Sequence, residues 1–144
     1  MRLLVTALMY CGFGLVTLAS SAQSFKESEL RDGDAKLLTS EEIRSLHADR
    51  TVFLHNVVSG QRVPIWFGAD GIRAFRAGNR VFTGEWGARE NKRCEETVVG
   101  PVVCMTIYRR GDELLICDPR EAPDCRWRIT RSAEGDIEKL APKR

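Results

Sequence analysis

Few residues of this chain are of types and spacings that could do chemistry, and none matches a catalytic or metal-binding pattern. The two histidines, His47 and His55, lack the Glu-x-x-His or His-x-x-His spacing of metal ligands. We expect His47 near the C-terminus of a helix, where the helix dipole favours it, and His55 partly exposed on a strand. Adjacent carboxylates such as Glu41 and Glu42 point in different directions in regular structure, and a Gly-x-Ser-x-Gly nucleophile motif is missing. The sequence therefore predicts no catalytic residue, no metal and no cofactor, and we do not expect an enzyme.

An aromatic residue is the first candidate for binding. Trp66 and Phe67 are neighbours in a predicted strand, so they must face opposite sides of it. Trp66 shares its face with Pro64, and an exposed Trp66 would mark a groove or contact surface. The alternative is that the predicted helix covers this second face of the sheet.

The arginines are the second candidate for binding. Arg126 and Arg128 would share one face of a strand, and with Arg73 and Arg109 they would form a basic stripe for an anionic ligand. Ordinary solvation of a strand face is the alternative. The chain has 22 Lys and Arg against 20 Asp and Glu, a formal net charge of +2. This balance gives no electrostatic reason to expect nucleic acid or an acidic membrane as partner.

The N-terminus has the order of a secretory signal peptide. Arg2 precedes an apolar run over residues 3–18, and small residues then lead to Ala22, after which we expect cleavage. The run is shorter than the roughly 20 apolar residues of a spanning helix, which favours cleavage over its alternative, a retained membrane anchor. No further apolar stretch approaches that length, so we expect no membrane span after cleavage. Removing 22 of the 144 residues leaves 122, enough for one domain in the periplasm or outside the cell.

Export would place the remaining cysteines in an oxidising compartment, where disulfides form. Cys94, Cys104, Cys117 and Cys125 allow three pairings, and they lack the close Cys-x-x-Cys spacing of zinc sites. We favour the pairs Cys94 with Cys104 and Cys117 with Cys125, because each pair closes a short loop that contains turn residues. The alternative pairs Cys104 with Cys117 across a turn at Arg110-Gly111, which leaves Cys94 with Cys125.

The elements that would position these residues begin with a polar segment. Residues 23–36 show no apolar period, so we predict a flexible N-terminal arm before a domain at 37–141. Thr39 and Glu42 then form a capping box, and Leu38 can pack on Ile43. This pattern predicts a short helix ending near Ala48 or Asp49, which must dock on the rest of the domain.

In the rest of the chain, apolar and polar residues alternate with a period of two between groups of turn residues, which is typical of strands. Pro64 indicates an edge or a bulge in its strand. With one leading helix and none between the strands, the fold class is mainly β: an antiparallel meander forming a curved sheet or small barrel. The predicted strands cover 51–58, 62–67, 72–76, 80–86, 102–109, 112–117, 126–132 and 137–140.

The order of several short motifs resembles a family of short exported proteins of Gram-negative bacteria with no assigned activity. The motifs are the capping box at 38–43, Gly60, residues 67–71, Gly84-Glu85-Trp86 and the pair Cys94 and Cys104. The resemblance implies a periplasmic setting and a bridge from Cys94 to Cys104, and no catalytic residues. Gly84-x-Trp86 is also similar to the Gly-x-Trp of lipocalins, although here it lies in the middle of the chain.

These features predict a small exported binding or interaction module. Its partner would be an unknown periplasmic protein or a small, partly apolar molecule. The alternative is a periplasmic enzyme or enzyme inhibitor whose residues no local motif marks, such as Arg126, Arg128 and a distant carboxylate. Convergent polar groups in a deep pocket would favour the enzyme, and a shallow exposed patch around Trp66 would favour a protein partner.

Overall fold

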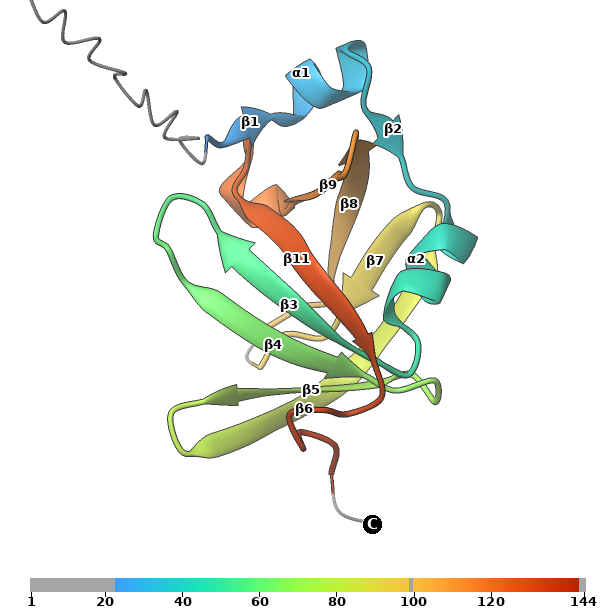
Figure 1. Cartoon of the computed structure of the whole chain (residues 1–144), viewed down its shortest axis with the longest axis vertical. Helices are drawn as coiled ribbons and strands as arrows, with labels where there is room; N and C mark the ends of the chain where they lie inside the picture. The colour runs from blue at the N-terminus through green and yellow to red at the C-terminus, as the bar shows by residue number, and fades with distance from the viewer. Residues whose placement is uncertain (1–22, 99, 143–144) are drawn as a thin grey trace, which may run out of the picture.

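The computed structural model describes residues 23–98 and 100–142, and the predicted signal peptide, with Cys11, lies outside them. Eight antiparallel strands form a closed barrel (Figure 1). They are β3 (Arg50–Asn56), β4 (Arg62–Phe67), β5 (Ile72–Ala77), β6 (Arg80–Arg89), β7 (Lys92–Glu95), β8 (Val103–Arg110), β9 (Glu113–Cys117) and β11 (Trp127–Glu134). Each pairs with the next barrel strand, and β11 closes the barrel by pairing with both β9 and β3. The predicted fold class is confirmed, and closure of the sheet protects its strand edges.

Alternation along the strands sorts side chains to the two sides of the barrel wall. Val52 and Leu54 of β3 face inward, opposite Ile65 and Val63 of β4. These residues belong to a continuous apolar core inside the barrel. Its buried members are Leu38, Ile43, Val52, Leu54, Ile65, Phe67, Ala88, Val103, Met105, Ile107, Ile116 and Ile129.

One helix, α2 (Ser40–His47), lies against β3, β6 and β7 (Figure 1). Thr39 accepts a hydrogen bond from the Glu42 amide at 3.2 Å, and the Glu42 side chain accepts one from the Thr39 amide at 2.8 Å. The predicted capping box is therefore confirmed. Hydrogen bonds from Lys36 and Thr39 lower the pKa of Glu42 from 4.5 to about 2. The helix buries Ile43 and His47 against the barrel, as its short length requires.

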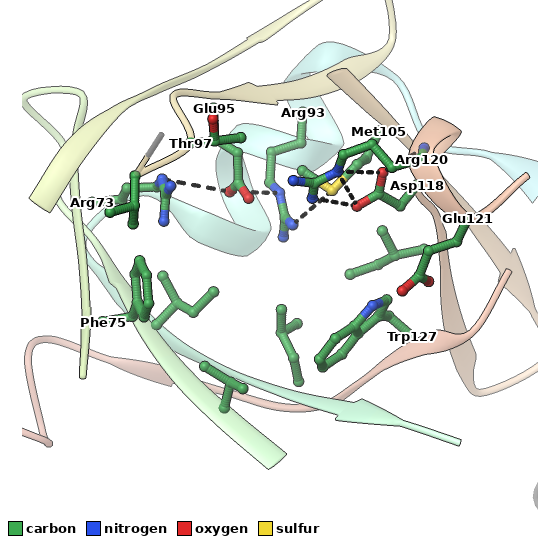
Figure 2. Close-up of a pocket in the computed structure, with 15 residues that line it drawn as sticks. Arg73, Phe75, Arg93, Glu95, Thr97, Met105, Asp118, Arg120, Glu121 and Trp127 are labelled. Atoms are coloured by element: carbon green, nitrogen blue, oxygen red, sulfur yellow. Dashed lines mark hydrogen bonds and ion pairs between the residues drawn. The ribbon is translucent and has the colours of Figure 1, made fainter. Parts of the chain in front are cut away.

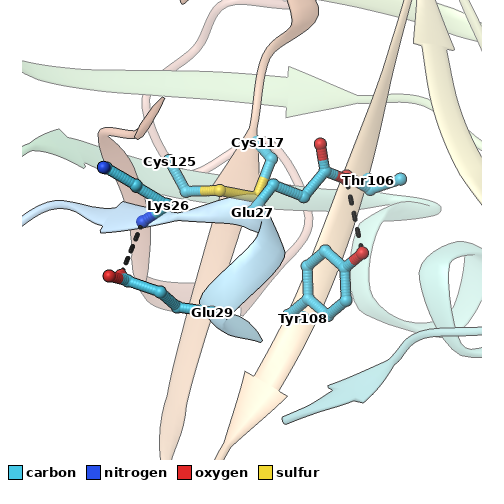
Figure 3. Close-up of a disulfide and its surroundings, with 7 residues drawn as sticks. All are labelled: Lys26, Glu27, Glu29, Thr106, Tyr108, Cys117 and Cys125. Atoms are coloured by element: carbon cyan, nitrogen blue, oxygen red, sulfur yellow. Dashed lines mark hydrogen bonds between the residues drawn. A yellow bond between two sulfur atoms is a disulfide. The ribbon is translucent and has the colours of Figure 1, made fainter. Parts of the chain in front are cut away.

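The segment 23–36 is ordered, so the prediction of a flexible arm is wrong. It contains β1 (Phe25–Lys26), α1 (Glu27–Asp32) and the first residue of β2 (Lys36–Leu37), which extends the sheet beside β8. β1 pairs with the short strand β10 (Asp124–Cys125). Glu27 accepts hydrogen bonds from Thr106 at 2.7 Å and Tyr108 at 3.3 Å (Figure 3). Leu30 is 1% exposed, and this single buried side chain anchors a helix with no periodic apolar pattern.

Both disulfides join neighbouring strands. Cys94 pairs with Cys104 between β7 and β8, where the two residues are direct cross-strand partners. Cys117 pairs with Cys125 and joins β9 to β10, on which the N-terminal segment is docked (Figure 3). The favoured pairing is thus confirmed over its alternative. The second disulfide is part of an outer apolar cluster that also contains Leu30, Tyr108 and Leu115.

Three strand-level expectations differ from the structure. Residues 137–138 form a turn and 139–140 have no regular structure, and β7 was not predicted because its four residues are mostly charged. Pro64 is not on an edge strand, since β4 pairs with β3 and β5 without a register shift. The ladder between β4 and β5 begins only at Ile65, so Pro64 lies outside it and its missing N–H breaks no bond there.

Candidate ligand-binding cavity

A cavity of about 360 Å³ lies in the interior of the barrel (Figure 2). Residues of the β7–β8 loop, Thr97 and Val98, and of the 3-10 helix η1 (Pro119–Glu121) flank its opening. One part of the wall is apolar and another is charged. The apolar lining is Leu54, Val63, Ile65, Phe75, Met105, Ile116 and Trp127, and the charged lining is Arg73, Arg93, Glu95, Asp118, Arg120 and Glu121.

The strand register places three charged side chains inside the barrel. Arg93 and Glu95 are two residues apart on β7, so they share a face, and Arg93 lies opposite the buried Met105 of β8. Arg73 of β5 lies opposite the buried Phe67 of β4. The side chains of Arg93, Arg73 and Glu95 are 1%, 6% and 11% exposed. Charged groups this deeply buried are rare unless they are paired or bind something.

These three residues form a loose ionic cluster. Oε2 of Glu95 lies 3.6 Å from Nε of Arg93 and 3.8 Å from Nε of Arg73. Both distances are too long for hydrogen bonds, and within residues 23–98 and 100–142 these three buried atoms have no hydrogen-bond partner. The η2 nitrogen of Arg73 does donate to the carbonyl of Glu96. The carboxylate of Glu95 is thus the shared counter-ion of Arg73 and Arg93, and it is hydrogen-bonded to neither through these atoms.

Arg93 has neutral acceptors for its other hydrogen bonds. Its Nη1 lies 3.1 Å from Nε2 of His47, its Nη2 donates to Sδ of Met105 at 3.4 Å, and its guanidinium lies 5.3 Å from the centre of the Phe67 ring. Burial is the main effect that lowers the pKa of Arg93, with a further contribution from Arg73, while Glu95 opposes it. Arg93 therefore carries a positive charge that its surroundings compensate only in part.

His47 supports Arg93 from the α2 side. Arginine can only donate, so Nε2 of His47 accepts, and Nδ1 donates to the carbonyl of Ile43 at 2.8 Å. Burial, with the charge of Arg93, lowers the pKa of His47 from 6.5 to about 3, against a hydrogen bond to Ile43 that raises it. The imidazole is therefore neutral and of fixed tautomer. The predicted position at the helix C-terminus is correct, but a role for the helix dipole is not needed because the ring is uncharged.

A second pair of charges lies at the mouth of the cavity. Arg120 donates to both carboxylate oxygens of Asp118. Burial raises the pKa of Asp118, but the hydrogen bonds from Arg120 outweigh it, so the pKa is lowered overall. Glu121 points toward Trp127, across the cavity from Arg73 (Figure 2), and its Oε2 is buried without a hydrogen bond from any described residue. The cavity thus has a positive inner end and an acidic group at its rim.

The structure places the predicted binding residues away from this cavity. Trp66 is half-buried on the outer side of the barrel wall, where its cross-strand neighbours Thr51 and Ala74 are fully buried. The C-terminal segment covers this area, because Thr51 donates to the carbonyl of Gly135 and accepts from the amide of Ile137. The patch at Trp66 is therefore partly covered, and by a segment other than the predicted helix.

Arg126 and Arg128 flank the inward-facing Trp127, so they lie on the outer side of the barrel. Arg126 pairs with Asp124 at 3.1 Å, and Arg128 pairs with Glu113 at 2.8 Å and donates to the Gln23 carbonyl at 3.0 Å. Arg73 faces the interior instead. Arg126 and Arg128 therefore share the outer face as predicted, but Arg73 does not join them, each of the two has a carboxylate partner, and Arg128 helps to hold the N-terminal segment.

Sequence reasoning missed Arg93 and Glu95 because it treated interspersed charges as solvated. One signal was available, since both residues flank Cys94 at i−1 and i+1. A disulfide from Cys94 to a strand partner would put Arg93 and Glu95 together on the opposite face from the bridge. Without the closed barrel, that face could not be recognised as the interior.

The chain matches no family model, no curated protein and no solved structure at a significant level. Among the described residues, His, Cys, Asp and Glu side chains do not form a group of three able to hold a metal ion. No helix within 23–98 and 100–142 has the length and apolar character needed to cross a membrane. A function must therefore be inferred from the geometry of this chain's own residues.

Proposed function

We propose that this protein is an exported binding module that holds a small, partly apolar ligand inside its barrel. The observation that carries the proposal is the cavity of about 360 Å³, whose wall is apolar on one side and charged on the other. Its volume lies within the range of roughly 300–1,000 Å³ for sites that bind small molecules. Apolar walls with a few placed polar groups are also typical of such sites.

A cavity of this size is not required by the architecture. An eight-stranded barrel has an interior that side chains can fill completely, and protein cores are packed with few voids larger than a water molecule. Here the apolar side chains of Leu54, Ile65 and Ile116 border open space. A chain selected for stability alone would gain by filling that space, because uncontacted core atoms lose dispersion energy. A binding role explains why the space is left open in this protein.

The surrounding scaffold is suited to a preformed site. The wall is a closed sheet, one disulfide joins β7 to β8 beside Arg93, and α2 holds His47 against the same residue. Rigid walls lower the ordering cost of binding. The predicted signal peptide and the two disulfides support a periplasmic or secreted location, where such a module would meet ligands outside the cytoplasm.

The convergent charged groups keep an enzyme as the second candidate. Arginine does not exchange protons near neutral pH, and His47, the group best suited to proton transfer, is completely buried behind Arg93. Binding therefore fits this set of groups better than catalysis. A protein partner at Trp66 has less support, because the C-terminal segment partly covers that area. If mass measurements showed that a bound ligand is converted into a product of different mass, the protein would be an enzyme.

Binding of a neutral fluorescent probe, N-phenylnaphthylamine, tests the proposal. Val63 lines the cavity, so Val63→Trp should fill the space and abolish probe binding. Val58 is 62% exposed in the turn after β3, and Val58→Trp is the matched control. Circular dichroism and thermal unfolding would verify that both variants fold. Loss of binding in V63W alone supports the proposal. Equal binding by both variants, or no binding by the wild-type protein, refutes it.

A further inference from the structure

We propose that the ligand is an amphipathic carboxylic acid whose carboxylate binds Arg93 and Arg73 at the inner end of the cavity. This inference rests on the proposed function and specifies the chemistry of its ligand. It starts from the charges of the inner end, where two buried guanidinium groups share the single carboxylate of Glu95. One positive charge is left in excess there. A buried charge is costly unless it is paired, so a ligand that supplies a negative charge is favoured over a neutral or cationic one.

The donors of Arg93 also lack strong acceptors. Its two Nη atoms bond to an imidazole nitrogen and a thioether sulfur, and its Nε lies 3.6 Å from Glu95 without a hydrogen bond to any described residue. A thioether sulfur is a weak acceptor. A carboxylate matches the planar guanidinium fork and can accept two parallel hydrogen bonds from it. A ligand carboxylate beside Met105 would thus replace the weakest of these contacts.

The remaining charges of the cavity set the orientation of the ligand. Asp118 and Arg120 neutralise each other at the mouth. Glu121 lies next to Trp127, across the cavity from Arg73 (Figure 2), and it repels an anionic group placed near the rim. The carboxylate is therefore expected at the inner end, with the apolar body of the ligand against Ile65, Ile116 and Trp127.

Three probes with one chain and different head groups test this inference: octanoate, octanol and octylamine. Each is titrated against bound N-phenylnaphthylamine in the wild-type protein. We expect octanoate to bind on the order of 10- to 100-fold more tightly than octanol, as for charge-assisted hydrogen bonds, and octylamine to bind most weakly. Octanol equal to octanoate, or octylamine binding best, overturns the inference and leaves the proposed function standing. Failure of the neutral probe to bind the wild-type protein overturns the proposed function itself.

Variants then assign the preference to the arginines. Arg93→Met keeps an extended side chain and leaves Glu95 paired with Arg73, so it should fold. It should remove most of the preference for octanoate while octanol still binds. Arg73→Met should weaken octanoate binding as well, and Arg76→Met, an exposed arginine on the same strand, should change nothing. Undiminished preference in both R93M and R73M would overturn the assignment. The head-group comparison in the wild-type protein stands even if a variant fails to fold.

Discussion

Acid should destabilise this protein through a single buried histidine, well above the pH at which carboxylates protonate. His47 is fully buried between Ile43, Phe67 and Arg93, and its pKa falls from 6.5 to about 3 on folding. The unfolded chain therefore binds a proton below pH 6.5 that the folded chain does not bind until about pH 3. The free energy of unfolding is therefore undiminished by His47 above pH 6.5, and it decreases as the pH falls from 6.5 to about 3.

The magnitude follows from the two pKa values. Each pH unit below 6.5 removes about 1.4 kcal/mol from the free energy of unfolding, until the folded pKa is reached. Between pH 7.5 and pH 5.0 the loss is therefore about 2 kcal/mol. Glu42 and Asp118 also have lowered pKa values, but their contributions are lost mainly below the ordinary carboxylate range. A measurement at pH 5.0 thus isolates the histidine.

Urea unfolding followed by tryptophan fluorescence at the two pH values is the assay. With both disulfides intact, we expect the midpoint to fall by about 1 M urea at pH 5.0. His47→Gln can still donate to the Ile43 carbonyl and accept from Arg93, so it should fold and lose most of this pH dependence. His55→Gln changes the only other histidine of the chain and should retain it.

Two results would refute the reasoning about His47. One is a wild-type protein equally stable at pH 7.5 and pH 5.0, which would mean that the imidazole can be protonated in the fold. The other is a variant H47Q with the full pH dependence of the wild type, which would place the titrating group elsewhere.

Three further predictions concern the elements around the barrel. Leu30→Ala should lower the free energy of unfolding by about 3 kcal/mol in urea titrations, since Leu30 is 1% exposed, whereas Leu37→Ala, at a residue 38% exposed, should cost much less; equal costs would show that α1 is not part of the fold. Thr39→Ala should cost about 1 kcal/mol in the same assay by removing the cap of α2, and an unchanged midpoint would contradict the capping geometry. Replacing Cys117 and Cys125 together by Ala should cost about 2.5 kcal/mol, and amide hydrogen exchange should then rise first in β1 and α1; uniform exchange would argue against this coupling.

Local sequence signals predicted the elements whose cause is local. The capping box of Thr39 and Glu42 fixed the start of α2, because its two hydrogen bonds join residues three positions apart. Alternating residues and turns likewise predicted seven of the eight barrel strands. The strand at 137–140 was wrong, because Leu140 is buried by a turn over the outer side of the barrel and not by a strand ladder.

Segments stabilised by distant contacts escaped prediction. The folded structure of residues 23–36 depends on the pairing of β1 with Cys125, on hydrogen bonds from Thr106 and Tyr108, and on the burial of Leu30. All these partners lie far along the chain, so the polar composition of the segment indicated only disorder. Strand β7 was missed for a similar reason, since two of its three charged residues, Arg93 and Glu95, become interior only when the barrel closes.

By itself the sequence determined the mainly β class, the leading helix and the favoured disulfide pairs, because spacing and turn chemistry act over a few residues. It could not determine which face of each strand is interior, because only closure between β11 and β3 defines an inside. That closure turned Arg73, Arg93 and Glu95 from apparent surface charges into the lining of a cavity, and left Arg126 and Arg128 outside. The candidate site was therefore decided by the tertiary structure, which brings together residues from strands far apart in sequence and removes their charges from water.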